Sequence, residues 1–208
     1  MPDYRIKSVH AVQVQSRRHN MAVSARVETM DGAVGKALCY AGVSVGTHEV
    51  HFQYDGGNRW GGLGCMSAVR NVNTIIADTI LGMDVRNQFE IDQAMLSIQG
   101  NGSASVGGNA IAAVSAAVLK AGAAATQMPL YRYIGGENAC MLPVPGAPAF
   151  SGGERWGGAV HTHGNKPTGA FQCFGYDSFS EASSAAWDMY HLFAKELEKA
   201  KDDLAELE

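Results

Sequence analysis

The hydrophobic pattern of this chain changes its period at Cys65, and that change limits the folds open to it. Before Cys65, residues 4–14, 21–29 and 30–40 alternate apolar and polar side chains, and an Asp-Gly pair opens the third run. Alternation at every second residue predicts strands with one buried face, whereas the later spacing of three and four predicts amphipathic helices. Three strands followed by helices predict an α+β domain built on a three-stranded antiparallel meander.

Three helices are expected to cover this sheet. The first, from Cys65 to Gly82, is expected to bury Ala68, Val69, Val72, Ile75, Ile76, Thr79 and Ile80. The second, over residues 87–97, is expected to turn inward Phe89, Ile91, Ala94, Met95 and Ile98. The third, over residues 109–125, is so rich in alanine that it can approach its neighbours closely on every side. The α+β domain is expected to end near residue 136.

The remaining segment predicts less regular structure and then one long helix. Prolines interrupt GGENACMLPVPGAPAF, which is typical of a linker that leads into a short buried strand. Residues 171–176 predict a second short strand, and Ser178 or Ser180 can cap the helix that follows. Apolar residues repeat along this helix with an average spacing of 3.5, at Tyr190, Phe193, Leu197, Ala200, Leu204 and Leu207. Such a stripe packs either on the core of its own subunit or on another subunit.

Composition excludes several classes of function. With 46% hydrophobic and 17% charged residues the chain has a packed core, and a net charge of -4 with scattered basic residues argues against nucleic-acid binding. The N-terminus lacks the apolar segment of a signal peptide, so we expect a cytoplasmic protein with reduced thiols. Residues 110–126 contain Ser115 and Lys120, and we expect no membrane span there. The four cysteines have no zinc-ligand spacing.

The order of several motifs resembles the enolase family, in its N-terminal capping domain and the start of its barrel. These motifs are AGVSVGTHE (41–49), YDGGNRWGGLG (54–64), AVRNVNTIIA (68–77), VGGNAIAAVSAAVLKAGA (106–123), PLYRYIGG (129–136), LPVP (142–145) and SFSEASSAAWDMYHLFAKEL (178–197). The resemblance implies a capping domain over residues 1–136, with a three-stranded antiparallel meander plus helices. It also implies that residues 137–208 form a linker and a partial enolase-type α/β barrel, with two strands and a long C-terminal helix.

The resemblance gives the glycine-rich segment the role of a lid over the substrate. Ser44 matches the serine that coordinates a second magnesium ion in this family, and Gly42 and Gly46 supply the hinge freedom that a lid needs. Glu49 matches a loop anchor. A plain glycine turn with an exposed serine is the alternative for this segment.

Two catalytic positions of the family are changed in this chain. The family has a histidine after a pair of glycines, where this sequence has Glu154 and Arg155. Arginine grips a phosphate or carboxylate but does not shuttle protons near neutral pH. The family's Gln-Glu pair becomes Gln172 and Cys173, which removes an acid. We therefore expect Gln172 and Arg155 in a site that lacks the ordinary acid-base residues.

Basic residues give the segment 151–172 an affinity for anions. His161, His163 and Lys166 lie close to Arg155 and would suit a small anionic ligand. An H-x-H pair on a strand can also chelate a metal, because alternate side chains share one face; solvated or substrate-touching histidines are the alternative. Arg17 matches an arginine near the family's dimer interface, although an exposed turn cation fits equally well.

Three hypotheses follow for function. In the first, the chain is half of a split, magnesium-assisted lyase for a small carboxylate, phosphorylated or not. A second chain would supply the metal carboxylates, the base and the missing strands, because a barrel closes only when all its strands pair. The chain alone would then be inactive. The second hypothesis is a non-catalytic enolase-derived binding or scaffolding protein, and the third is self-association that pairs the open edges.

Overall fold

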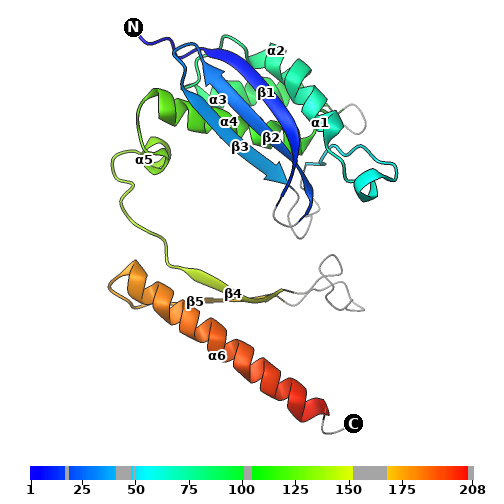
Figure 1. The fold of residues 1–208 in the computed structure, drawn as a ribbon. Helices are drawn as coiled ribbons and strands as arrows, with labels where there is room; N and C mark the ends of the chain where they lie inside the picture. Colours follow the sequence, from blue (N-terminus) through cyan, green and yellow to red (C-terminus); the bar gives the residue numbers. More distant parts are fainter. Residues whose placement is uncertain (17–18, 41–47, 49, 101–104, 152–167, 206–208) are drawn as a thin grey trace. The chain divides into compact units, whose positions relative to one another are not determined.

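The computed structural model describes residues 1–16, 19–40, 48, 50–100, 105–151 and 168–205. These residues form two compact units, Met1–Ala139 and Cys140–Glu208 (Figure 1). The division after Ala139 lies close to the boundary expected after residue 136.

The first unit is built on the expected antiparallel meander. Its strands are β1 (Ile6–Gln15), β2 (Met21–Thr29) and β3 (Val34–Tyr40), in the order β1-β2-β3. Ala25 of the central strand faces Ala11 on one side and Ala37 on the other, and all three side chains are buried. The alternation seen in the sequence is therefore the alternation between the covered and the open face of this sheet.

Helix α4 (Gly108–Ala125) covers one face of the sheet and lies closest to it at β3 (Figure 1). Its buried side chains are small, and they include Ala113, Ala117 and Ala121. A Cβ atom added to Gly35 of β3 would overlap the carbonyl oxygen of Ala117 and the backbone nitrogen of Ala121. Backbone therefore packs directly on backbone at this point, which requires glycine on the strand and alanine on the helix.

By length and composition alone, α4 qualifies as a membrane-crossing helix, contrary to the expectation drawn from its serine and lysine. Half of this helix is nevertheless buried inside the protein, and the core helix of a soluble protein meets the same criterion. Contact with β2 and β3 gives a sufficient reason for its apolar composition.

The helix expected over residues 65–82 is present but contains a π-helical turn. It consists of α1 (Met66–Asn71), the π turn η2 (Val72–Ile76) and α2 (Ala77–Ile80). The side-chain amide of Asn73, in the π turn, accepts a hydrogen bond from Ala11 N (2.6 Å) and donates one to Ala11 O (3.0 Å). This turn holds more residues than an α-helical turn, so Ile75 leaves the buried stripe. The expectation that Ile75 is buried was wrong, because 46% of its surface is exposed.

Helix α3 (Gln88–Ser97) buries Ile91 and Met95 as expected, but Phe89 is 74% exposed. Two residues separated by two positions lie on nearly opposite sides of an α-helix, so Phe89 and Ile91 cannot both face the core. A further helix, α5 (Leu130–Gly135), was not predicted. It begins after Pro129, and its Tyr133 hydroxyl lies where any side chain on Gly122 of α4 would have to be.

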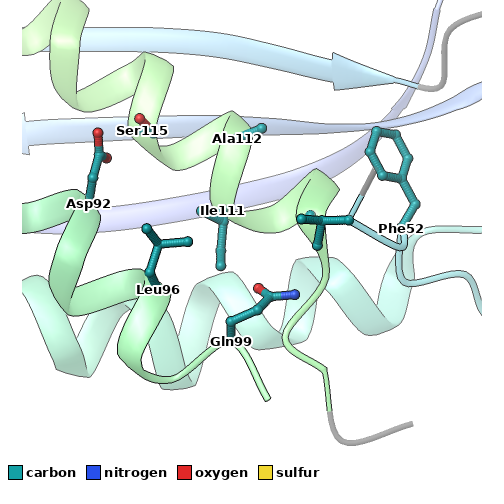
Figure 2. Close-up of a pocket in the computed structure, with 9 residues that line it drawn as sticks. Phe52, Asp92, Leu96, Gln99, Ile111, Ala112 and Ser115 are labelled. Carbon is teal, nitrogen blue, oxygen red and sulfur yellow. The ribbon is translucent and has the colours of Figure 1, made fainter. Parts of the chain in front are cut away.

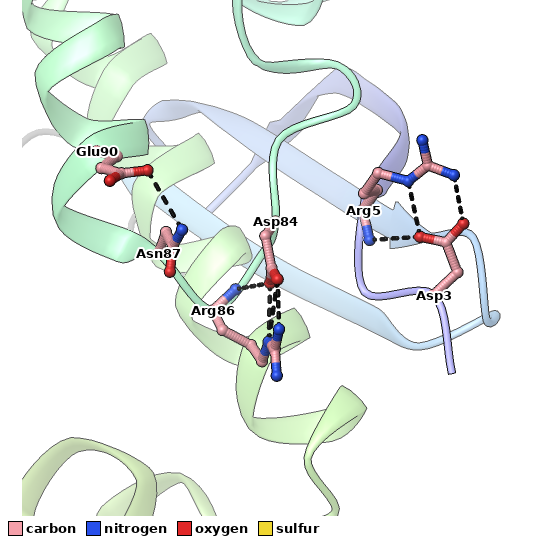
Figure 3. Close-up of polar contacts among 6 residues, drawn as sticks. All are labelled: Asp3, Arg5, Asp84, Arg86, Asn87 and Glu90. Atoms are coloured by element: carbon pink, nitrogen blue, oxygen red, sulfur yellow. Dashed lines mark hydrogen bonds and ion pairs between the residues drawn. The ribbon is translucent and has the colours of Figure 1, made fainter. Parts of the chain in front are cut away.

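The start of β1 is fastened to the segment between α2 and α3 by backbone pairing. Arg5 and Asp84 form an antiparallel bridge, and Ile6 N donates to Met83 O at 2.8 Å. Figure 3 shows the side chains at this bridge, where Arg5 pairs with Asp3 and Arg86 pairs with Asp84. These ion pairs are solvent-exposed, so the backbone bonds contribute more to the fastening than the charges do.

The second unit contains an antiparallel pair of strands, β4 (Gly146–Ser151) and β5 (Thr168–Gln172), with helix α6 (Phe179–Ala205) against β4. The strand expected over residues 171–176 was misplaced, because β5 ends at Gln172. Gly175, three residues after the end of β5, has a φ of 85°, which is not an extended conformation. Closure of a barrel around this pair stays a prediction.

Helix α6 begins with the expected serine cap. Ser178 Oγ accepts a hydrogen bond from Glu181 N (3.2 Å), which satisfies one backbone donor of the first turn, and donates to Glu181 Oε2 (3.0 Å). Within the unit, Phe193 packs edge-on against Phe171 of β5, with ring centroids 5.7 Å apart. Tyr190 and Leu197 of the same apolar stripe are about half exposed, so this part of the stripe stays available for a packing partner.

We expect Gly35→Ala to destabilise the first unit by about 1–3 kcal/mol, because the added methyl group would push α4 away from β3. The free energy of urea unfolding measures this change. Lys36→Ala, at the exposed neighbouring position of β3, is the control and should change stability by less than about 0.5 kcal/mol. Equal stabilities for the two variants would contradict direct backbone packing at this position.

Candidate functional site

Most residues predicted for the site lie outside the described part of the chain. These are the lid residues Gly42, Ser44 and Gly46 and the anion-binding residues Arg155, His161, His163 and Lys166, together with Arg17, Glu49 and Glu154. Their roles, including Ser44 as a magnesium ligand, stay predictions. Within the described ranges, no group of three or more His, Cys, Asp or Glu side chains is arranged to hold a metal ion.

Gln172 is the predicted catalytic residue that the structure does describe. It is the last residue of β5, its side chain is exposed, and it lies opposite Gly146 of β4. The next side chain, Cys173, is buried, and its Sγ lies 3.6 Å from Sδ of Met189 in α6. Gln172 is therefore presented to solvent while Cys173 packs under the helix, so the two neighbours have separate environments.

A cavity of about 510 Å³ lies in the second unit where β5 ends. Its walls are residues 140–145 of the linker, residues 173–179 after β5, and Ala182 of α6. The proline-rich linker therefore lies beside the end of β5. Sequence reasoning treated this linker as a connection and missed its place in a cavity wall, for which the sequence gives no periodic signal.

The segment that follows the predicted lid is held by a buried asparagine at the start of α4. Asn109 is only 1% exposed; its Oδ1 accepts from Gln53 N (3.0 Å) and its Nδ2 donates to Gln53 O (3.1 Å). Two residues earlier, Gly107 has a φ of 103°, and a side chain there would overlap Gln53. Gly108 N also donates to His51 O at 3.0 Å. The chain beyond the lid is thereby fixed to the helix that packs on the sheet.

The loop from Asp55 to Gly64 is closed on itself and attached to α1. Asp55 N donates to Gly64 O at 2.8 Å, and the Asp55 carboxylate accepts from Met66 N (2.9 Å) and Ser67 N (2.7 Å). Burial alone would raise the pKa of Asp55, but the hydrogen bonds from Ser67 and Met66 outweigh it and hold the pKa below its usual range. Asp55 therefore acts as a charged cap for α1, not as a proton donor.

Cys65 attaches the start of α1 to β1, and the contacts of Asn109, Asp55 and Cys65 together form a frame after the predicted lid. Cys65 is 2% exposed, and its backbone N donates to Gln13 Oε1 of β1 at 2.6 Å. Burial raises the pKa of the Cys65 thiol to about 11, although the hydrogen bond from Asn109 works in the opposite direction. The thiol is thus neutral near pH 7 and serves packing, since the thiolate is the reactive form.

Both described ends of the predicted lid are therefore mounted on the folded core. The segment leaves the sheet at Tyr40, the last residue of β3, and re-enters the described chain in the segment pinned by Asn109. The polar side chains of this frame are hydrogen-bonded to backbone groups. They are therefore suited to positioning the loop and not to catalysing a reaction. Sequence reasoning missed Asn109; its signal was a polar residue at the start of an otherwise apolar helix.

The sequence profile described as "Enolase, N-terminal domain" matches residues 6–134, which run from β1 into α5. The chain belongs to the enolase family. Its first unit is the family's N-terminal capping domain, with the three-stranded antiparallel sheet and helices that the motifs implied.

Individual enolases are similar over nearly the whole chain. The protein named Enolase from Campylobacter jejuni strain 81-176 is 40% identical over 195 residues, which cover 92% of this chain and 46% of that protein. The Enolase from Methanosarcina acetivorans is 40% identical over 201 residues, which cover 95% of this chain and 45% of that protein. The Enolase from Methanopyrus kandleri is 41% identical over 204 residues, which cover 97% of this chain and 46% of that protein. The chain spans about half the length of the curated relatives it matches.

Replacing Asn109 with alanine should release the segment after the lid. The change leaves Gln53 N and O without their partners, and we expect a loss of about 2–4 kcal/mol in the free energy of unfolding. Asn87→Ala is the matched control, because Asn87 is exposed and its amide contacts only Glu90 among the side-chain bonds of this region. A loss no larger than that of the control would show that Asn109 does not anchor this segment.

Stability at alkaline pH should report on Cys65. The folded thiol has a pKa of about 11 against an ordinary value of 9.0, so the unfolded chain ionises first as the pH rises. The contribution of the neutral Cys65 thiol to the free energy of unfolding is complete below pH 9. It falls by on the order of 2 kcal/mol as the pH rises to 11. Urea unfolding between these pH values should show the decline, and Cys65→Ala should flatten it. The same slope in both proteins would refute the assignment.

Proposed function

We propose that this chain supplies the lid and part of the active site of a cytoplasmic, magnesium-assisted lyase of the enolase type. The substrate would be a small carboxylate, phosphorylated or not, and a second chain would complete the site. The observation that supports this proposal is the pairing of Asn109 with Gln53, which fixes the segment after the predicted lid to α4 of an enolase N-terminal domain. A fixed attachment beside a mobile loop is what a lid that closes over a ligand needs.

Each predicted site residue has a role in this proposal. Ser44 closes over the ligand on the hinges Gly42 and Gly46, and Gln172 offers its exposed amide at the end of β5. The anionic groups of the substrate are held by Arg155, His161, His163 and Lys166. Because Arg155 does not release a proton, its part is binding and charge neutralisation.

Magnesium is the metal that the family implies. It prefers oxygen ligands and is held in proteins by one or two carboxylates. The described residues do not fit it by themselves, since no group of three or more His, Cys, Asp or Glu among them is arranged to hold a metal ion. We therefore assign the metal carboxylates and the base to the second chain, and Ser44 to a second metal position.

Exposed apolar side chains on α6 support a further packing partner. Trp187, Leu192 and Leu197 are 65%, 61% and 50% exposed, on a helix whose alanine side is already buried against the strands. A second chain that contributes barrel strands would cover them. Self-association of this chain would cover the same surface with a copy of itself.

A non-catalytic, enolase-derived binding or scaffolding protein is the alternative, and Cys173 favours it. The family's glutamate would stand at this position, yet the site is buried beside the thioether of Met189. A carboxylate there would be desolvated, whereas a thiol packs well. The packing at this position is therefore adapted to cysteine and not to an acid.

The two functions are separated by isolating the tagged chain from its native cells together with whatever binds it. The complex should hydrate phosphopyruvate with magnesium and stop when the metal is chelated, while the chain alone should be inactive. Ser44→Ala should lower kcat/KM by about 10-fold to 100-fold. Ser97→Ala, at an exposed serine of α3, is the control and should leave kcat/KM unchanged. A complex without turnover, with phosphopyruvate binding indifferent to Ser44→Ala, would favour the binding protein.

A further inference from the structure

A cavity of about 440 Å³ lies in the capping domain between α3, α4 and the segment after the predicted lid (Figure 2). Its volume falls within the range typical of small-molecule pockets. On the α4 side the wall is made by the small residues Gly108, Ala112 and Ser115, which recur at helical spacing, together with Ile111. Leu96 of α3 stands opposite them and is 51% exposed. The hollow lies where three small residues of α4 face longer side chains of α3.

The middle of this pocket is apolar. Leu96 and Ile111 lie between its two polar ends, and the ring of Phe52 stands at one side (Figure 2). These side chains would take up the hydrocarbon part of a ligand, since burial of their exposed surface is favourable.

One polar end has more hydrogen-bond acceptors than donors. Asp92 and Ser115 lie together there (Figure 2), and both accept from the same side-chain amide, that of Gln88. Gln88 Nε2 lies 3.1 Å from each carboxylate oxygen of Asp92, 3.0 Å from Ser115 Oγ and 3.2 Å from Ser115 O. Two amide hydrogens thus serve four acceptor atoms. In the described chain, no lysine, arginine or histidine forms a salt bridge with Asp92.

The other polar end of the pocket also has a hydrogen-bond acceptor without a donor. The amide nitrogen of Gln99 donates to Ser105 Oγ at 2.7 Å, but its oxygen is buried and has no donor among the described residues. A buried acceptor without a donor costs free energy, so both ends of the pocket favour a ligand that brings donors.

We infer that this pocket binds a small amphipathic amine. Its ammonium group would donate to the Asp92 carboxylate and Ser115 Oγ, for which its three N–H donors and positive charge are suited. Its apolar body would lie between Leu96 and Ile111. The Asp92 carboxylate disfavours anions, so this ligand class differs from the anionic substrate of the proposed function, and the inference does not depend on that function.

The test is a titration of the full-length, ¹⁵N-labelled chain with 2-phenylethylamine, followed by NMR. We expect saturable shifts at the backbone N–H groups of Leu96, Gln99 and Ile111, with a Kd of about 1 mM or tighter. The neutral isostere 2-phenylethanol should bind at least about 10-fold more weakly, because it lacks the charge-assisted bonds. Equal affinities for the amine and the alcohol would overturn the inference, as would the absence of saturable shifts at about 10 mM amine.

Variants identify the pocket and the charge. Asp92→Asn should weaken amine binding at least about 10-fold and leave alcohol binding unchanged. Asp78→Asn, an exposed acid of α2, is the matched control and should bind the amine like the unmodified chain. Ala112→Phe should fill the hollow and abolish both titrations while the chain stays folded by circular dichroism. Amine binding that survives either Asp92→Asn or Ala112→Phe would overturn the inference, and the second variant decides the matter if the first does not fold.

Discussion

The close contact between the backbone of α4 and that of β3 at Gly35 is the constraint on which the capping domain depends. It sets the side chains on the buried side of α4 to alanine and valine, and it brings the start of the helix to the end of the sheet. Gly107 and Asn109 can hold the segment after the predicted lid only because the helix begins there. A packing contact in the core thus determines where a surface loop can be mounted.

The polar groups of this frame position the chain and do not react. Asp55 caps a helix as a carboxylate, Asn109 pairs with backbone, and the pKa of Cys65 is raised by burial, so that its thiol stays neutral. Enolase-type chemistry needs groups with the opposite properties, namely metal-binding carboxylates and a base poised to accept a proton. The described residues of this chain, which spans about half the length of the curated relatives it matches, thus supply positioning.

Sequence periodicity predicted the meander and the main helices because one face of each element is buried against a single core. It failed where local geometry departs from the ideal repeat, and where an expected position did not fit that repeat. The π turn moved Ile75 out of the buried stripe, a spacing of two put Phe89 on the wrong side of α3, and Gly175 ended the extended backbone early. The lid residues came from resemblance to a family and the anion-binding residues from the charge of their segment, since loops carry no periodic signal. The frame around Asn109 depends on contacts across more than fifty positions, which a pattern cannot reveal.

The π turn also has a consequence for association between molecules. β1 is an outer strand of the sheet, and its backbone groups at Ala11 point away from β2. An unpaired strand border of this kind is a template for cross-molecular β-pairing and fibre growth. The amide of Asn73 occupies both groups of Ala11, as an incoming strand would, so a second molecule cannot pair with β1 at this position.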